Sequence, residues 1–310
     1  MQEVILLDGG TGRELARIGA PFRQPEWSAL SLIEAPEYVT KVHSAYVKSG
    51  ADVITTNSYA IVPFHIGVDR FFARGEELAS LAGRLARQVA DQSSTPIKVA
   101  GSLPPLCGSY RADLFKSEEA RPILEILVRG LRPYVDHWQA ETLSTIEEAE
   151  LVRDVIGPDD KPLWISFTLK DDDVSTDQPE LRSGQSVNDA VYAALKLNVS
   201  AILFNCSQPE VMGSAIRVAR ELLISHDSEI RIGVYANAFP PQSKDAEANS
   251  GLDDIRTDLN PEGYLKWAHE WVELGTSIIG GCCGIGPEHI QLLHDRIVDK
   301  KSISCRSPSE

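Results

Sequence analysis

The feature that most restricts the fold of this chain is a regular alternation of short, β-branched runs with longer amphipathic stretches. The run "EVILL" predicts a strand, and in the stretch that follows Val39, Val42 and Tyr46 recur on one helical face. The alternation continues to the end of the chain. Strands are predicted at 3–7, 52–56, 97–102, 137–142, 162–169, 200–206, 230–237 and 276–282, and helices at 34–50, 74–92, 117–136, 145–156, 186–197, 209–225, 261–274 and 287–299.

Repeated strand–helix units predict parallel strands, and eight such units predict an α/β fold that closes into a single (β/α)8 TIM barrel. The alternative is an open, doubly wound sheet with a small second domain. No linker, repeat or low-complexity tract divides the chain, so we expect one barrel domain over 1–300 and a disordered tail over 301–310. The stretch 236–259 is too long for an ordinary connection and predicts a mobile lid or an oligomer contact.

The chain has 310 residues with 30 Lys and Arg against 45 Asp and Glu, a net charge of −15. This balance argues against nucleic acid or an anionic membrane as a partner held by a general electrostatic field. No apolar run approaches the roughly 20 residues that span a bilayer, and the start "MQEVILLDGG" lacks the features of a secretory signal. We expect a cytoplasmic protein whose thiols stay reduced, and the oligomeric state is left open.

Two adjacent cysteines, Cys282 and Cys283, lie between glycine-rich turns at the end of the eighth predicted strand. A disulfide between them is disfavoured because adjacent Cα atoms lie about 3.8 Å apart, whereas a relaxed bridge needs roughly 4.4–6.8 Å. The flanking glycines allow a bend that turns both thiols toward one object. Cys206 ends the sixth strand, which is a second neighbour of the eighth around a closed barrel.

These positions predict a metal site of three cysteines with one open coordination position, as catalytic zinc requires. The alternative is that the three are buried as small apolar residues. Cys107 follows the third strand and Cys305 lies in the tail, and neither is assigned a role in the site.

Several motifs occur in a fixed order along the chain: "LLDGGTGREL", "TTNSY", "GSLPP", "AET" followed by "EEAE", "FNC" and "GGCCGIGPEHI". From about residue 4 to 298 the chain resembles the homocysteine S-methyltransferases, including the S-methylmethionine- and betaine-dependent enzymes. The resemblance implies a single-domain barrel that uses Zn²⁺, held by three cysteines, to activate L-homocysteine. It implies methyl transfer from a sulfonium donor to the homocysteine thiol, giving methionine.

The resemblance also implies roles for particular residues. Cys206, Cys282 and Cys283 would hold zinc, Glu141 would bind the amino group of homocysteine with help from Asp8, and backbone groups near Gly9, Gly10 and Thr55 would line the pocket, with Asn237 as a further substrate contact. For Glu141 and Asp8 the alternative is an ordinary hydrogen bond at the barrel rim. Asn205 and Asn237 are pocket or supporting residues, or alternatively cap a turn. The nucleophile would be the substrate thiolate, and no protein nucleophile is expected.

The acceptor thiol has to be activated: a free thiol has a pKa near 8.5, so a bound metal is needed to keep the substrate thiol ionised at neutral pH.

The identity of the methyl donor is less constrained. The segment "YANAFPPQS" departs from the "YPNSGE" of enzymes that use S-methylmethionine. S-methylmethionine or S-adenosylmethionine is the leading donor, and betaine or another methyl onium compound is the alternative.

Other acceptors and one non-enzymatic role remain open. Selenocysteine or another small thiol is an alternative acceptor, and a zinc–thiolate redox sensor is the alternative without turnover. Aromatic faces can bind the methyl groups of a cation. The aromatic residues near predicted rim segments are Trp27, Tyr59, Phe64, Tyr110, Trp138 and Tyr235, of which we expect one or two to contact the donor.

Overall fold

The eight predicted strands form one parallel sheet in the computed structural model, which describes residues 3–299 except 160, 173, 175–176 and 241–254. The order around the sheet is β1-β8-β7-β6-β5-β4-β3-β2, and a parallel bridge between Leu7 and Val53 joins its two ends. The prediction of a closed (β/α)8 barrel is therefore confirmed. The strands are β1 Ile5–Leu6, β2 Val53–Thr55, β3 Lys98–Leu103, β4 His137–Leu143, β5 Leu163–Phe167, β6 Ala201–Asn205, β7 Arg231–Tyr235 and β8 Ile278–Ile279.

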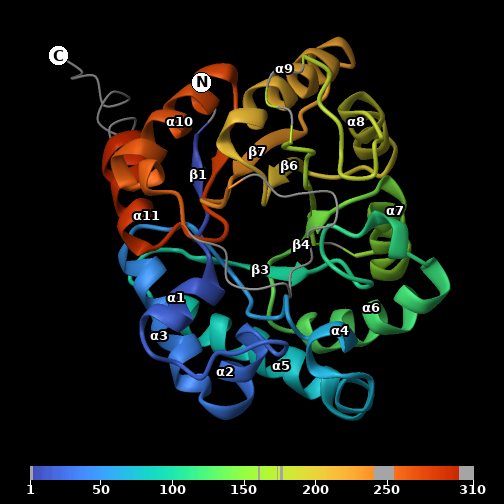
Figure 1. Cartoon of the computed structure of the whole chain (residues 1–310), viewed down its shortest axis with the longest axis vertical. Helices are drawn as coiled ribbons and strands as arrows, with labels where there is room; N and C mark the ends of the chain where they lie inside the picture. The colour runs from blue at the N-terminus through green and yellow to red at the C-terminus, as the bar shows by residue number, and fades with distance from the viewer. Residues whose placement is uncertain (1–2, 160, 173, 175–176, 241–254, 300–310) are drawn as a thin grey trace.

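A ring of helices surrounds the strands (Figure 1). These are α3 Pro36–Lys48, α5 Val68–Gln92, α6 Ser117–Leu131, α7 Ile146–Ile156, α8 Val187–Lys196, α9 Pro209–Ser225, α10 Pro261–Leu274 and α11 Pro287–Leu293, with the last continuing as a π-helical turn, His294–Val298. Each matches a predicted helix. The prediction for α6 was too long, because Pro133 lacks the backbone N–H that would continue the helix. Helix α5 begins before its predicted start at residue 74.

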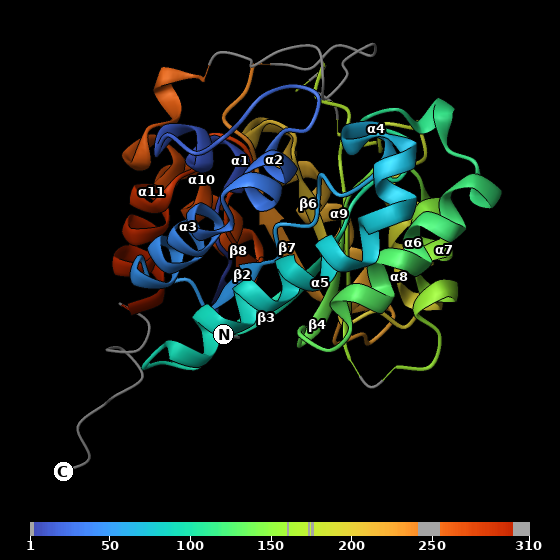
Figure 2. The ribbon, with the colours of Figure 1, turned by 90° about the horizontal axis from the view of Figure 1, so that it is seen from below.

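Short elements that the sequence pattern missed follow the carboxyl ends of the strands. They are α1 Thr11–Arg17, α2 Ser28–Glu34 and α4 Pro63–Ile66, with 3-10 turns at Ala112–Leu114 and Thr257–Leu259. Helices of one or two turns are too short to show a helical period in the sequence. Figure 2 shows α2 and α4 at the upper side of the molecule.

Apolar side chains fill the rest of the barrel. One cluster of buried residues lies within the ring of strands, and a larger one lies between strands and helices. All seven residues of β4 are buried, as expected for a parallel strand that is covered on both faces. None of the described helices combines the length and apolar character needed to cross a bilayer. Two predictions, the tail 301–310 and most of the segment 236–259, concern residues outside the described part of the chain.

The first loop of the barrel packs tightly against the last one. A Cβ atom on Gly9 would lie 2.2 Å from the carbonyl oxygen of Ile285, and one on Gly10 would lie 2.6 Å from that of Cys282. Backbone atoms cannot yield as a flexible side chain can, so both positions require glycine on grounds of space.

We predict that Gly9→Ala lowers the free energy of unfolding by about 1–3 kcal/mol, as overpacking of a tight contact does. Gly12→Ala is the matched control three residues further on. The nearest neighbours of an added Cβ atom there lie at 3.5 Å, and Gly12 is within α1, where alanine is favoured. Denaturant unfolding of both variants measures the difference. Equal stability of the two would show that the loops can separate without cost.

Candidate functional site

A cavity opens at the carboxyl ends of the strands and encloses about 1140 Å³, counting its open mouth. Among the described residues, seven of the eight strands, all but β5, contribute to its lining, either directly or through the loops that follow them. The lining residues are Leu7, Asp8, Gly9, Gly10, Thr11, Gly12, Arg13, Trp27, Ser28, Thr55, Thr56, Asn57, Tyr59, Ser109, Tyr110, Gln139, Glu141, Thr142, Cys206, Tyr235, Phe239, Gly281, Cys282 and Cys283.

Three cysteines meet at this cavity. The sulfur atoms of Cys206, Cys282 and Cys283 all lie within 4.8 Å of one another, although Cys206 follows β6 and the other two follow β8. The predicted convergence is confirmed. The structure also joins Cys206 and Cys282 in a disulfide and leaves Cys283 outside it. The prediction that Cys282 does not pair with Cys283 therefore holds, but the expectation that all three thiols stay free is wrong for this structure.

The donor set fits a metal ion once the disulfide is reduced. Tetrahedral zinc with sulfur ligands at about 2.3 Å places the sulfurs about 3.8 Å apart. The three sulfurs here all lie within 4.8 Å of one another, so small side-chain shifts would bring them to that spacing. Three protein ligands leave one position for a substrate. Only thiolates can serve as ligands, so the bridged pair has to accept two electrons and release its bond before all three sulfurs can bind one ion.

Backbone contacts fix the turn that carries Cys282 and Cys283. The amide of Cys282 donates to the carbonyl of Ala236 at 2.9 Å, and the carbonyl of Cys283 accepts from Ala238 at 2.8 Å. Gly284 follows with a φ of +86°, a conformation that glycine adopts readily and other residues rarely do. This is the sharp bend that lets two adjacent thiols face the same point.

Glu141, on β4, is a buried carboxylate at the cavity. Ser102 donates a hydrogen bond to it at 2.5 Å and the hydroxyl of Tyr235 donates another at 3.2 Å, while Gln139 donates to that same hydroxyl. Burial raises the pKa of the Glu141 carboxyl above its ordinary value, and these hydrogen bonds only partly offset the effect. The side chain is thus held in place by neutral donors.

Asp8 is the second buried carboxylate and follows β1. Thr55 binds it twice, through its backbone amide at 2.7 Å and its hydroxyl at 2.9 Å. Burial raises the pKa of Asp8 to about 7, against the lowering effect of both contacts. Thr55 therefore lies at the cavity, where its amide orients Asp8, and its contact with substrate stays a prediction.

Four of the six aromatic residues singled out from the sequence line the cavity: Trp27, Tyr59, Tyr110 and Tyr235. Trp138 does not, because it is the second residue of β4 and lies fully buried at the amino end of the strand, where its indole donates to Asp159. Phe64 is 37% exposed on α4 and is also outside the lining.

Sequence reasoning missed several residues of the lining. Arg13 lies at the cavity with its guanidinium 5.3 Å from the ring centroid of Phe239, and Ser109 shares a hydrogen bond of 2.6 Å with the hydroxyl of Tyr59. The signal for Arg13 is its spacing, because it follows the Gly9–Gly10 turn within the first turn of α1. No comparable pattern marks Phe239 or Ser109.

Two asparagines near strand ends, Asn205 at the end of β6 and Asn237 after β7, lie behind the cavity wall. Asn205 accepts from the Thr142 amide at 3.0 Å and from the Ser166 hydroxyl at 2.7 Å, which ties three strand ends together. Asn237 is fully buried, and its side-chain oxygen accepts from the amide of Phe239 at 3.2 Å. Asn237 is not among the lining residues, so its predicted contact with substrate remains a prediction.

Comparison with known proteins agrees with this geometry. The sequence model of the family described as homocysteine S-methyltransferase matches residues 5–297. A selenocysteine Se-methyltransferase of Brassica oleracea var. italica is 28% identical over 98% of this chain and 92% of its own length, and homocysteine S-methyltransferase 2 of Arabidopsis thaliana is 27% identical over 96% and 94%.

Among solved structures, the metallated form of the homocysteine methyltransferase MmuM from Escherichia coli superposes with a TM-score of 0.74 at 27% identity, covering 95% of this chain and 96% of that one. The family match spans nearly the whole barrel, including every strand and all three cysteines of the cluster. The chain therefore belongs to the homocysteine S-methyltransferase family and is a methyltransferase.

Proposed function

We propose that this protein transfers a methyl group from a cationic donor to the thiol of L-homocysteine, giving methionine, at a zinc site formed by Cys206, Cys282 and Cys283. The observation that carries the proposal is the convergence of three sulfurs beside two buried carboxylates in one cavity. A redox sensor would need the sulfurs alone, whereas an enzyme acting on an amino acid also needs groups that bind its amino end.

The three cysteines would hold zinc with one position left for the substrate sulfur. When bound there, zinc lowers the pKa of a thiol so that it is present as thiolate at neutral pH. In the reaction the new carbon–sulfur bond forms as the donor's carbon–onium bond breaks, and the donor leaves as a neutral thioether or amine. The thiol proton leaves to solvent before transfer. Since the ligands have to be reduced, we expect the protein to work in a reducing compartment such as the cytoplasm.

The two acids would bind the amino group of homocysteine. Glu141 is held by Ser102 and Tyr235, and neither partner carries a charge that would compete with an ammonium group. A buried carboxylate gains most from a cation that arrives with the substrate, because the ion pair forms where water is excluded. Asp8, which follows β1 and is bound by Thr55, adds a second negative group once it is ionised.

The mouth of the cavity would receive the donor. Trp27, Tyr59 and Tyr110 offer aromatic faces of the kind that bind methyl groups on a cation. Arg13, stacked on Phe239, offers a positive group for a carboxylate. This pairing suits a donor that carries both a methyl onium group and a carboxylate, which S-methylmethionine, S-adenosylmethionine and betaine all do.

Selenocysteine is a second candidate acceptor, because one of the similar proteins is a selenocysteine Se-methyltransferase. Its reactive atom lies one methylene nearer to the amino group than the sulfur of homocysteine does. The distance from the two acids to the three cysteines thus favours one acceptor over the other. The ratio of kcat/KM for homocysteine to that for selenocysteine measures this preference.

The direct test combines metal content with turnover. Protein purified under reducing conditions should contain about one zinc ion per chain and should form methionine from L-homocysteine with at least one of S-methylmethionine, S-adenosylmethionine or betaine. Elemental analysis and mass spectrometry provide the two measurements. Cys206→Ser should lose zinc and turnover together. The proposal fails if no donor yields methionine, or if Cys206→Ser retains full activity.

Glu141→Gln separates substrate binding from metal binding. We expect kcat/KM for homocysteine to fall roughly 30- to 1,000-fold, about 2–4 kcal/mol for loss of a buried charge partner, with zinc content unchanged. Glu148→Gln is the matched control: Glu148 is equally buried and caps α7 through the amides of Ser144 and Thr145, away from the cavity. If both variants lose activity to the same extent, Glu141 has no special part in binding.

Asp8 should make amino-acid binding depend on pH. With a pKa of about 7, its carboxyl passes from about 90% ionised at pH 8 to about 10% at pH 6, while the amino group of the ligand stays protonated. Methionine, which lacks a titrating thiol, should therefore bind up to about tenfold more weakly at pH 6, by calorimetry on zinc-loaded protein. Asp8→Asn should flatten this dependence, and an unchanged slope in that variant would rule out Asp8 as its source.

A further inference from the structure

Cys206 occupies a backbone conformation that few residues other than glycine adopt. Its φ is +49°, in the left-handed region, and its own amide reaches the carbonyl of Tyr235 only at 3.4 Å. Its carbonyl accepts from the hydroxyl of Thr168 at the same long distance. These contacts are too weak to impose the conformation, so neighbouring residues have to supply the constraint.

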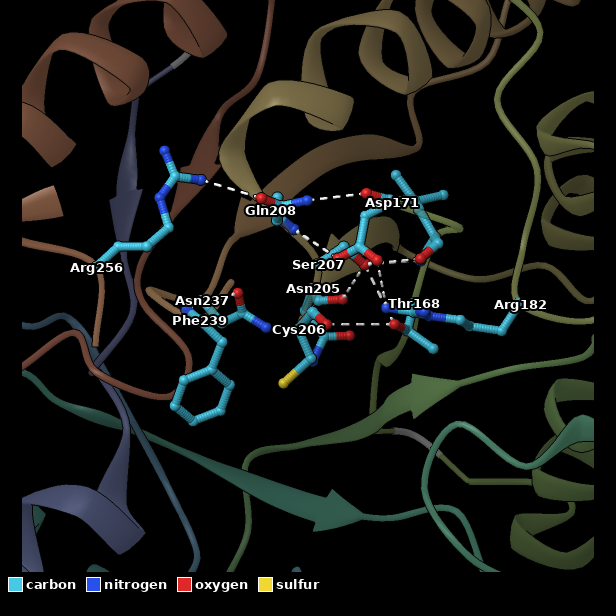
Figure 3. A network of polar contacts seen from close by, with 11 residues as sticks. Thr168, Asp171, Arg182, Asn205, Cys206, Ser207, Gln208, Asn237, Phe239 and Arg256 are labelled. Atoms are coloured by element: carbon cyan, nitrogen blue, oxygen red, sulfur yellow. Dashed lines mark hydrogen bonds and ion pairs between the residues drawn. The ribbon is translucent and has the colours of Figure 1, made fainter. Parts of the chain in front are cut away.

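Ser207 provides part of it. Its hydroxyl accepts a hydrogen bond from the amide of Leu169 at 2.8 Å, and its carbonyl accepts from the amide of Asn237 at 3.1 Å. The residue after Cys206 is thus attached to the loop after β5 on one side and to the loop after β7 on the other. Figure 3 shows this group of contacts around Asn205, Cys206 and Ser207.

Gln208 repeats the arrangement one residue later. Its amide donates to the carboxylate of Asp171 at 3.1 Å and its side-chain nitrogen donates to the carbonyl of Asp171 at 2.8 Å. Its side-chain oxygen accepts from Arg256 at 3.1 Å. Figure 3 shows Gln208 between Arg256 and Asp171, with the Cys206 sulfur pointing away from all three. The network therefore acts on the backbone of Cys206 and leaves its sulfur to the cavity.

A buried ion pair fixes Asp171 itself. One carboxylate oxygen accepts from Arg182 at 2.8 Å, and the other accepts from the amide of Gln208. The Asp171 side chain is 0% exposed and that of Arg182 is 7% exposed. The guanidinium also stacks over Tyr110 at 5.1 Å from the ring centroid. Since Tyr110 lines the cavity and Arg182 does not, the pair lies just behind the cavity wall.

We propose that the Asp171–Arg182 pair is a positioning device for Cys206, which holds the turn 206–208 so that its sulfur meets those of Cys282 and Cys283. The inference rests on the proposed zinc site and adds to it residues that touch neither metal nor substrate. Buried ion pairs are often no more stable than apolar groups of the same shape, so fixing one geometry is the more consistent reason for this one. Both oxygens of Asp171 are needed, because an amide in its place would set a donor against Arg182 or against Gln208.

The test measures zinc affinity of reduced protein by competition with a chromophoric chelator. Asp171→Asn should raise the dissociation constant for zinc by about 10- to 100-fold, as loss of an outer hydrogen-bonding partner does. With Co²⁺ in place of zinc, its thiolate charge-transfer absorbance should fall, because Cys206 no longer ligates in every molecule. That loss reports on the ligand set and would not follow from a general loss of stability.

Asp136→Asn is the matched control. Asp136 also binds an arginine and a backbone amide, Arg87 at 2.6 Å and Val99 at 2.7 Å, but it precedes β4 at the opposite end of the barrel. It should keep the zinc affinity and the cobalt spectrum of the wild type. Should Asp171→Asn fail to fold, Ser207→Ala, which removes one hydroxyl from the same turn, should weaken zinc binding severalfold.

The outcomes distinguish this inference from the function on which it rests. Wild-type protein that binds no zinc would overturn the proposed function. Zinc-binding wild type, with Asp171→Asn and Ser207→Ala both matching Asp136→Asn in affinity and spectrum, would overturn the positioning role and leave the function standing.

Discussion

Closure of the sheet by β1 determines where every part of the site lies. Its end pairs with both neighbours, Leu7 donating to Ile279 of β8 at 2.7 Å and Asp8 donating to Val53 of β2 at 3.0 Å. Because all eight strands are parallel, closure brings their carboxyl ends to a single rim. Residues from the two ends of the chain then face one cavity, and β6 and β8, each beside β7, bring Cys206 within reach of Cys282.

The loops after β1 and β8 form one unit above this junction. Gly281 donates to the carbonyl of Asp8 at 3.0 Å and Gly10 donates to that of Ile285 at 2.9 Å, while the hydroxyl of Tyr46 reaches the carbonyls of both Gly10 and Ile285. The backbone of Asp8 is therefore attached to the cysteine turn, and its side chain points the other way, to Thr55. The backbone of these two loops thus holds an acid and two sulfurs in a fixed relation.

The sequence predicted those features that depend on period and position along the strand. All eight strands, the polar residues at their ends and the three converging cysteines follow from that logic. The prediction for Trp138 was wrong by the same rule: it is the second residue of β4 and therefore lies at the amino end of the barrel, away from the cavity. Features that depend on three-dimensional distance were not predictable. The disulfide between Cys206 and Cys282, the place of Arg13 at the cavity and the burial of Asn237 behind its wall all depend on how loops of irregular length fold over the rim.

Three buried carboxylates near the rim show how structure and binding divide the acidic groups. Asp171 has its counter-ion built in as Arg182, so its charge is already satisfied and it can serve only to hold the fold. Asp8 and Glu141 are bound by the hydroxyl and amide donors of Thr55, Ser102 and Tyr235, and within the described residues neither forms an ion pair with lysine or arginine. Burial of a carboxylate without a cation is costly and raises its pKa, as it does for both. An ammonium group on the ligand would supply the positive charge that these two acids lack, which is why a cavity with both of them beside three sulfurs suits an amino acid that carries a thiol.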